Sequence, residues 1–442
     1  MQGLVEGTAI GPNKAESRRF FPRLDWKTIS LASIGGGLEF YDFIVYGVFA
    51  QYIAKAFFPA EDPAVSLVNT FAVFAIGYLS RPIGGIFISH IGDRFGRRRA
   101  FLLSLIAMTA ATMAMAAMPT HGSIGLSATI IFIALRFIQG CCVGGELPGA
   151  ITYVVETAPR RAGLACGIMF FCVNTGSFIA VFVSSMLHSY LSSDDMQSYG
   201  WRIGFAVGGV LGVIGFLLRS RLQESELFKT LGEKRAARLP ALEVIKSHWV
   251  PILLGVGVVG INQAFIAILN VGMTPYLSRV AGYDVKTATS VISYAVGLLS
   301  FGIVAVGFAS DFLPRRRILQ VGTFLLMVGS YPLYQAILGQ IVNLYLLFTV
   351  AVLVCALVTG TFGAVAAGLF PTRLRFSGLA ISYNLAAALI GGFTPLVTSW
   401  IVATSGDRAA PGIYLSIVAA LGFVCALLLK RYSPSDEAKL DR

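Results

Sequence analysis

The chain has 442 residues, of which 56% are hydrophobic and only 13% are charged, and its mean hydropathy is +0.76. Soluble domains carry about 25% charged residues, so this composition excludes an ordinary soluble enzyme and predicts a membrane protein. The formal net charge of +12 does not indicate nucleic-acid binding, because the positive charges lie in short connections between apolar segments. We therefore expect a lipid bilayer and no nucleic acid as partner.

Twelve apolar segments are long enough to cross a bilayer, which takes about 20 residues. They cover residues 28–57, 65–90, 100–118, 126–156, 163–190, 202–220, 248–277, 287–309, 318–338, 342–369, 377–404 and 411–431. The first 25 residues are polar and basic, so the first span is expected to be retained rather than cleaved. Most Lys and Arg residues lie in the two termini and the even-numbered connections. Cytoplasmic loops carry this excess, so both termini are predicted to be cytoplasmic.

One basic connection occurs twice, half a chain apart. Residues 89–99 read Ser-His-Ile-Gly-Asp-Arg-Phe-Gly-Arg-Arg-Arg, and a related stretch at 307–317 places Asp311 218 residues after Asp93 (311 − 93). Such repeats are typical of transporters whose site lies between two similar bundles. We predict a cytoplasmic tail over 1–25, a six-helix bundle over 26–220, a linker over 221–246, a second six-helix bundle over 247–432 and a cytoplasmic tail over 433–442.

Ionisable residues inside membrane spans are costly, so they mark functional sites or structural ion pairs. Five qualify, all in the first half: Glu39, Asp42, Arg81, Arg136 and Glu146. Glu39 and Asp42 are three residues apart and share one helical face. The ten residues between Arg136 and Glu146 amount to about 15 Å of helix. The four histidines and six cysteines show no metal-ligand spacing and no Walker motif is present, so we expect no enzyme activity, metal or cofactor.

Several segments resemble the Major Facilitator Superfamily and, within it, the metabolite:proton symporters. The first reads Glu-Phe-Tyr-Asp-Phe from residue 39; the matching segments are 39–47, 81–85, 92–98, 136–140, 144–146, 156–159, 369–375, 383–384 and 391–395. The resemblance implies an all-α membrane protein with twelve transmembrane helices in two six-helix halves related by a pseudo-two-fold axis. Residues 70–74, 391–395 and 406–412 look most like the citrate and tricarballylate carriers of that subgroup.

The resemblance also implies roles for particular residues. Spans one and four line the central cavity in this fold, so Asp42 and Arg136 are expected to face each other, as a proton switch or as a purely structural pair. The candidates for proton coupling are Asp42, Arg136, Glu39 and Glu146. Those for substrate binding are Arg136, Arg81, Tyr41, Gln139, Asn262, Gln263, Asn270, Tyr383 and Asn384. The cytoplasmic gate is expected to use Asp93, Arg94, Gly96, Arg97, Arg98, Glu156, Asp311 and Arg315, with Glu156 pairing with Arg97 or Arg98.

The function that these features favour is proton-coupled import of a small organic acid, such as citrate, across a bacterial inner membrane by alternating access. The expected partners are an anionic small molecule and the proton, and the protein is expected to act as a monomer. The alternatives are uptake of a zwitterionic osmolyte such as proline or betaine, uptake of a larger citrate conjugate such as a siderophore, and export of a drug or metabolite. A fourth alternative, from a different class, is a substrate sensor that no longer transports.

Overall fold

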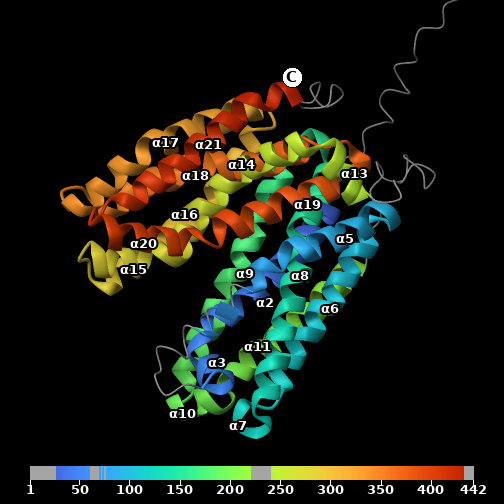
Figure 1. The fold of residues 1–442 in the computed structure, drawn as a ribbon, viewed down its shortest axis with the longest axis vertical. Coiled ribbons are helices and arrows are strands. Elements are labelled where there is room, and N and C mark those ends of the chain that lie inside the picture. Colours follow the sequence, from blue (N-terminus) through green and yellow to red (C-terminus); the bar gives the residue numbers. More distant parts are fainter. Residues whose placement is uncertain (1–25, 60–68, 71, 74–75, 221–239, 433–442) are drawn as a thin grey trace, which may run out of the picture.

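The structure is a computed structural model that describes residues 26–59, 69–70, 72–73, 76–220 and 240–432. Every regular element in these residues is a helix (Figure 1). Ten helical segments are long and apolar enough to cross a membrane. Large apolar side chains such as Phe178, Phe301 and Trp400 remain exposed on them. Helices satisfy their own backbone hydrogen bonds, which is what a span in lipid requires.

These ten segments correspond to the predicted spans three to twelve. Their bounds are Arg98–Ala117, Leu126–Thr157, Pro159–Tyr190, Ser193–Ser220, Trp249–Val280, Lys286–Ala309, Arg315–Gly339, Leu344–Ala367, Thr372–Val402 and Ala410–Tyr432. The first predicted span, 28–57, lies within the described residues, and the second, 65–90, falls partly outside them. Helices α2 (Trp26–Val48) and α3 (Ala50–Phe57) cover the first, and α5 (Arg81–Phe95) covers the end of the second. The predicted twelve-helix architecture is confirmed.

The first half is built around α2. This helix packs on α8 (Leu126–Thr157), α9 (Ala162–Tyr190) and α11 (Trp201–Ser220), and α6 (Arg97–Ala117) packs on α8 and α11. Aromatic rings fill its core: Phe57 stacks on Phe132 at 4.2 Å and meets Trp201 edge-on at 5.5 Å. Short helices α7 (His121–Ile124) and α10 (Ser193–Asp195), with a π-helical turn at Met196–Gly200, connect the spans.

The second half follows the same plan with two interrupted spans. Helix α14 (Trp249–Ala267) continues through the π-helical turn η4 (Ile268–Gly272), α15 (Met273–Pro275) and a second π-helical turn η5 (Tyr276–Val280), and α19 (Arg375–Ala386) continues through η7 (Ala387–Gly391) into α20 (Thr394–Ser405). The remaining helices are α16 (Val285–Ala309), α17 (Arg315–Gly339), α18 (Leu344–Ala367) and α21 (Ala410–Tyr432). Irregular turns of this kind frequently mark functional sites.

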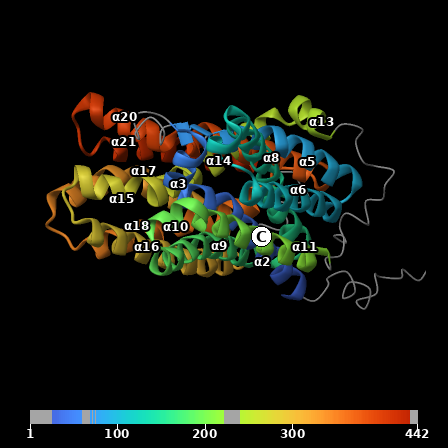
Figure 2. The ribbon, with the colours of Figure 1, turned by 90° about the horizontal axis from the view of Figure 1, so that it is seen from below.

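The two halves meet along two helix pairs, α5 with α19 and α9 with α16. At the second contact, a Cβ on Gly163 would clash with the Gly307 carbonyl oxygen, so only glycine lets the backbones approach this closely. Arg98, Arg160, Arg315 and Arg373 lie in the connections at this end, which we call the basic end. In Figure 1 the halves diverge toward α3 and α10 on one side and α15 and α20 on the other; we call this the far end. Figure 2, seen from below, shows α15, α16 and α20 on the left and α5, α6 and α11 on the right.

The predicted linker is described only over its last part. Residues 221–239 and both predicted tails lie outside the described residues. Helix α13 (Pro240–Ser247) lies at the basic end and contacts both α5 and α19. Its Glu243 forms an ion pair with Arg373, which precedes α19. The described part of the linker therefore contacts both halves where they are closed.

Candidate functional site

The basic end is held closed by contacts between the halves. The buried Asp93, near the end of α5, accepts a hydrogen bond of 2.8 Å from the backbone N–H of Ser377 in the first turn of α19. Carboxylates are stabilised there because helix N-termini present unpaired N–H groups and a partial positive charge. Glu156 at the end of α8 lies 3.6 Å from Arg375, and both side chains are buried. Both contacts require the halves to be together at this end.

The second copy of the basic connection makes the matching contact in the opposite direction. Asp311 follows α16 in the second half and accepts hydrogen bonds from the backbone N–H groups of Gly163 at 2.8 Å and Leu164 at 3.1 Å, at the start of α9. Asp311 also forms an ion pair with Arg315, with 2.9 Å between Asp311 Oδ1 and Arg315 Nη2. Each half thus caps a helix of the other, which is the pseudo-symmetry that the repeated sequence indicates.

The remaining predicted gate residues behave differently. Glu156 lies against Arg375, a partner that was not expected, and Arg98 donates to the carbonyl oxygen of Ser220 at 2.7 Å; the expected pairing of Glu156 with Arg97 or Arg98 stays a prediction. Arg94 is exposed beside the ring of Phe95. Gly96 has a φ of 107°, a conformation that favours glycine. The side chain of Arg97 lies outside the described part. The sequence analysis missed Arg375, because it stands at the boundary of a span.

A cluster of cationic and aromatic side chains lies where the halves meet at mid-depth. Arg136 of α8 lies over the ring of Tyr46 at 4.4 Å, and Arg81 of α5 lies over the ring of Tyr78 at 4.0 Å. The two arginines are electrostatic neighbours. Tyr383 of α19 interacts with Arg81 and with Gln263 of α14. We call these six residues (Tyr46, Tyr78, Arg81, Arg136, Gln263 and Tyr383) the central cluster. Both halves contribute to it, and it combines guanidinium groups, which carboxylates bind in proteins, with aromatic rings, which apolar cations bind.

Asp42 connects to the central cluster indirectly. Arg136 donates to Gln139 Oε1 at 3.1 Å, and Gln139 Nε2 donates to the Thr112 hydroxyl at 2.8 Å. Thr112 lies beside the fully buried Asp42, but donates to the carbonyl oxygen of Met108. Among the described residues no donor makes a hydrogen bond of ordinary geometry to either Asp42 carboxylate oxygen. No ion pair joins Asp42 to Arg136, both of which are described; instead, a hydrogen-bonded chain runs from Arg136 through Gln139 to Thr112, which lies beside Asp42.

Glu146 is part of a separate ion pair. Its carboxylate lies 2.5 Å from Arg219 at the end of α11 and also accepts a hydrogen bond from Ser104 of α6. Arg219 is 1% exposed and lies over the ring of Phe101. Arg219 lies next to the last residue of the predicted span 202–220 and was not counted among the ionisable residues inside spans, so this partner was overlooked. The contact joins three helices of the first half near the basic end.

Several predicted substrate residues instead hold helices together. Asn262 accepts a hydrogen bond from Thr359 of α18, Asn384 donates to the Gly144 carbonyl oxygen of the other half, and Tyr41 donates to the Gly204 carbonyl oxygen of α11. Asn270 is exposed toward the far end. The side chain of Glu39 lies outside the described residues. The structure therefore brings Arg81, Arg136, Gln263 and Tyr383 together, with Gln139 attached, and leaves Tyr41, Asn262, Asn270 and Asn384 outside this cluster.

Comparison with known proteins places the chain in a family. The sequence matches the Major Facilitator Superfamily over residues 32–382. The Proline/betaine transporter of Salmonella typhimurium (strain LT2) is 30% identical over 419 residues, covering 91% of this chain and 83% of that protein. The Glycine betaine/proline/ectoine/pipecolic acid transporter OusA of Dickeya dadantii is 30% identical over 418 residues with the same coverage. These relatives do not support the expected resemblance to citrate carriers.

Solved structures show the same fold. The proton:xylose symporter XylE bound to 6-bromo-6-deoxy-D-glucose has a TM-score of 0.76 at 17% identity, covering 92% of this chain and 96% of that chain. The transporter FucP in its outward conformation has a TM-score of 0.66 at 13% identity, covering 91% and 98%. The family match over most of the sequence and the relatives at 30% identity show that the chain belongs to the Major Facilitator Superfamily of membrane transporters.

Proposed function

We propose that the protein imports a small zwitterionic osmolyte, of the proline or betaine class, together with a proton. Relatives that carry the name proline/betaine transporter align with 91% of the chain. The sequence analysis gave this substrate class as an alternative and placed citrate first. The central cluster supports the alternative, because it combines two arginines for one carboxylate with three tyrosine rings and, among its described members, no carboxylate.

The substrate carboxylate would bind between Arg81 and Arg136. Guanidinium groups recognise carboxylates through paired hydrogen bonds. The methylated or ring nitrogen of the substrate would then lie against tyrosine faces, which attract apolar cations. Those faces are now covered by the two arginines themselves. Movement of the arginines toward the carboxylate would uncover the rings, so the two ends of a zwitterion would be bound in one rearrangement.

The single observation that carries the coupling proposal is the position of Asp42. Its side chain is fully buried, it has no ion pair among the described residues, and the Gln139–Thr112 bridge links its surroundings to Arg136. An unpaired buried carboxylate is costly when ionised. When Arg136 moves to the substrate, Gln139 and Thr112 are released and can reorient. Asp42 would hold the proton in the loaded state and lose it when the bridge re-forms.

The closed basic end defines the state of the transporter. Loops rich in Lys and Arg favour the cytoplasmic side, so we take the basic end as cytoplasmic and the structure as the outward-facing state. Import then requires the Asp93 and Asp311 contacts to break while the far end closes. Substrate binding would bias this two-state equilibrium, because only differential contacts between the two states can shift it.

The test is uptake into proteoliposomes with labelled glycine betaine, proline and citrate, each with and without an inward proton gradient. We expect accumulation of glycine betaine or proline that requires the gradient, and no accumulation of citrate. Citrate accumulation alone would contradict the zwitterion proposal. Binding of either zwitterion without any flux would favour a sensor, and gradient-driven efflux would favour an exporter.

A further inference from the structure

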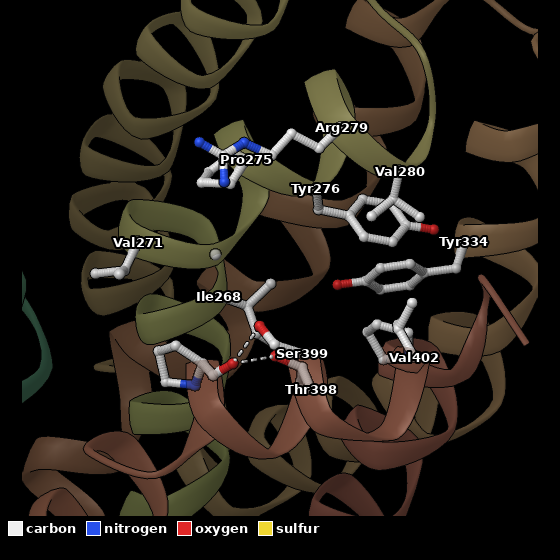
Figure 3. Close-up of a pocket in the computed structure, with 13 residues that line it drawn as sticks. Ile268, Val271, Pro275, Tyr276, Arg279, Val280, Tyr334, Thr398, Ser399 and Val402 are labelled. Atoms are coloured by element: carbon white, nitrogen blue, oxygen red, sulfur yellow. Dashed lines mark hydrogen bonds between the residues drawn. The ribbon is translucent and has the colours of Figure 1, made fainter. Parts of the chain in front are cut away.

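A pocket of about 280 Å³ lies inside the second half, toward the far end and apart from the central cluster. Helices α15 and α20 form its walls, with η4, η5, Tyr334 of α17 and Pro411 of α21 (Figure 3). In Figure 1, α15 and α20 lie on the edge of this half that faces the first half. The volume is below the range of about 300–1,000 Å³ that holds drug-sized ligands. The occupant that fits is therefore a small molecule.

Tyr334 supplies a polar group directed into this pocket. The residue is 2% exposed, yet its hydroxyl makes no hydrogen bond with any of the described residues. Figure 3 shows this hydroxyl pointing into the pocket between Ile268 and Tyr276. Tyr276, by contrast, donates its hydroxyl hydrogen bond to the carbonyl oxygen of Arg408. The hydroxyl oxygen is not among the enclosed polar atoms that lack a partner, so it opens onto the pocket, where a ligand oxygen can accept its hydrogen bond.

Arg279 lies at the mouth of the pocket. Its guanidinium extends over Pro275 (Figure 3), it is exposed, and it forms no ion pair or hydrogen bond with a described residue. Among the described residues, no Asp or Glu lines the pocket. The rings of Tyr276 and Tyr334 lie edge to face, 5.0 Å apart. An anionic group would thus bind Arg279 and the Tyr334 hydroxyl, whereas a cationic group would meet aromatic faces and no carboxylate.

We propose that this pocket is an outer loading site for the same zwitterion that the central cluster transports. The inference rests on the proposed function. A carboxylate joined to a methylated or ring ammonium matches the pocket, because aromatic faces bind cations that carry apolar substituents, and each N–H that is replaced by carbon leaves one donor fewer to pair. The π-helical turns η4 and η5, which line one wall of the pocket, would allow it to reshape when the far end closes. The site would hold substrate at the far end, before it moves to the central cluster and the halves close on it.

The test measures binding at the pocket separately from transport. Val271 lines the mouth and is 56% exposed, so a Val271→Cys variant is labelled with a membrane-impermeant maleimide. Labelling is timed with increasing glycine betaine or proline in an Arg136→Gln background, which disables the central cluster. We expect either zwitterion to slow the labelling. Tyr334→Phe and Arg279→Gln should each raise the half-protecting concentration about tenfold, the usual loss for a hydrogen bond to a charged group.

Matched variants test whether these effects are local. Tyr331→Phe removes a hydroxyl one turn earlier on α17, and Lys286→Gln removes an exposed cation near the start of α16; neither residue lines the pocket. Both should leave protection unchanged. In the Arg136-intact protein, Tyr334→Phe should raise the KM of uptake with little change in maximal rate.

The outcomes separate this inference from the proposed function. Uptake without protection of the thiol in the Val271→Cys variant would overturn the outer site alone. Slow labelling that neither zwitterion changes would also overturn it, because lipid or protein would then fill the pocket. Protection without uptake would overturn the proposed import and leave the site standing. Loss of both would overturn both.

Discussion

Replacement of Asp311 by Asn tests how the basic end is held closed. The Asp311 side chain is fully buried and accepts two backbone hydrogen bonds from the start of α9 in the other half. Asn keeps the shape, but it loses the charge and one acceptor oxygen. A hydrogen bond to a charged group is worth about 1.5–3 kcal/mol. The contact to Arg315 lies within one half and does not depend on closure. We therefore expect Asp311→Asn to destabilise the closed basic end by about 2 kcal/mol, a shift of about 30-fold in the conformational equilibrium.

Pulsed electron paramagnetic resonance can measure this shift. Spin labels at Tyr190→Cys and Ile341→Cys report the separation of the far ends, since these residues are 79% and 92% exposed in opposite halves. The six native cysteines are buried or half-buried. Asp311→Asn should move the distance distribution toward shorter separations. Asp284→Asn is the control, because Asp284 caps α16 within its own half. An unchanged distribution for Asp311→Asn, or an equal change for Asp284→Asn, would refute the reasoning.

Two further predictions concern packing. Glu146→Gln leaves Arg219 buried without its carboxylate, which should cost about 3–5 kcal/mol of stability and lower the midpoint of thermal unfolding in detergent. Adding Arg219→Gln should recover part of the lost stability. An unchanged midpoint for Glu146→Gln alone would argue against a buried ion pair. Gly163→Ala places a Cβ in steric conflict with Ser310 Oγ, so it should shift the same distance distribution toward the state open at the basic end. Gly297→Ala, which meets nothing within 4 Å, should leave the distribution as it is, and a shift there would show that the effect is not steric.

The sequence alone predicts much of the fold because the membrane imposes strong patterns. Apolar length gives the spans, and the repeat of Asp93 at Asp311 indicates two similar halves whose equivalent residues close one end. The structure places both carboxylates at helix N-termini of the opposite half. This partner could not be read from the sequence, because the N–H groups involved belong to helices far away in the chain. Their identity depends on how the halves pack.

The partners of the buried ion pairs could not be predicted from the sequence for the same reason. Arg219 is 73 residues from Glu146. It stands at the end of a predicted span, where a basic residue is expected to face the cytoplasm rather than a buried carboxylate. Arg375 is hidden in the same way at the start of α19. The expected contact between Asp42 and Arg136 was placed by span number, which does not fix side-chain depth or the intervening Gln139 and Thr112.

The pocket at the far end has no signature in the sequence. Tyr334 lies in an apolar span and looks like an ordinary core aromatic residue. Its unpartnered hydroxyl becomes visible only when the interrupted spans α14–η5 and α19–α20 are seen to leave space around it.

The most direct test of the account is to separate exchange from accumulation in the Asp42→Asn variant. In proteoliposomes with equal internal and external pH, labelled glycine betaine outside is exchanged for unlabelled glycine betaine inside; an inward proton gradient is then applied in a second measurement. The account predicts that Asp42→Asn exchanges substrate at a rate comparable to the wild type but does not accumulate it with the gradient, because the site that carries the proton is lost. Gradient-driven accumulation at the wild-type level in Asp42→Asn would contradict the proposed coupling.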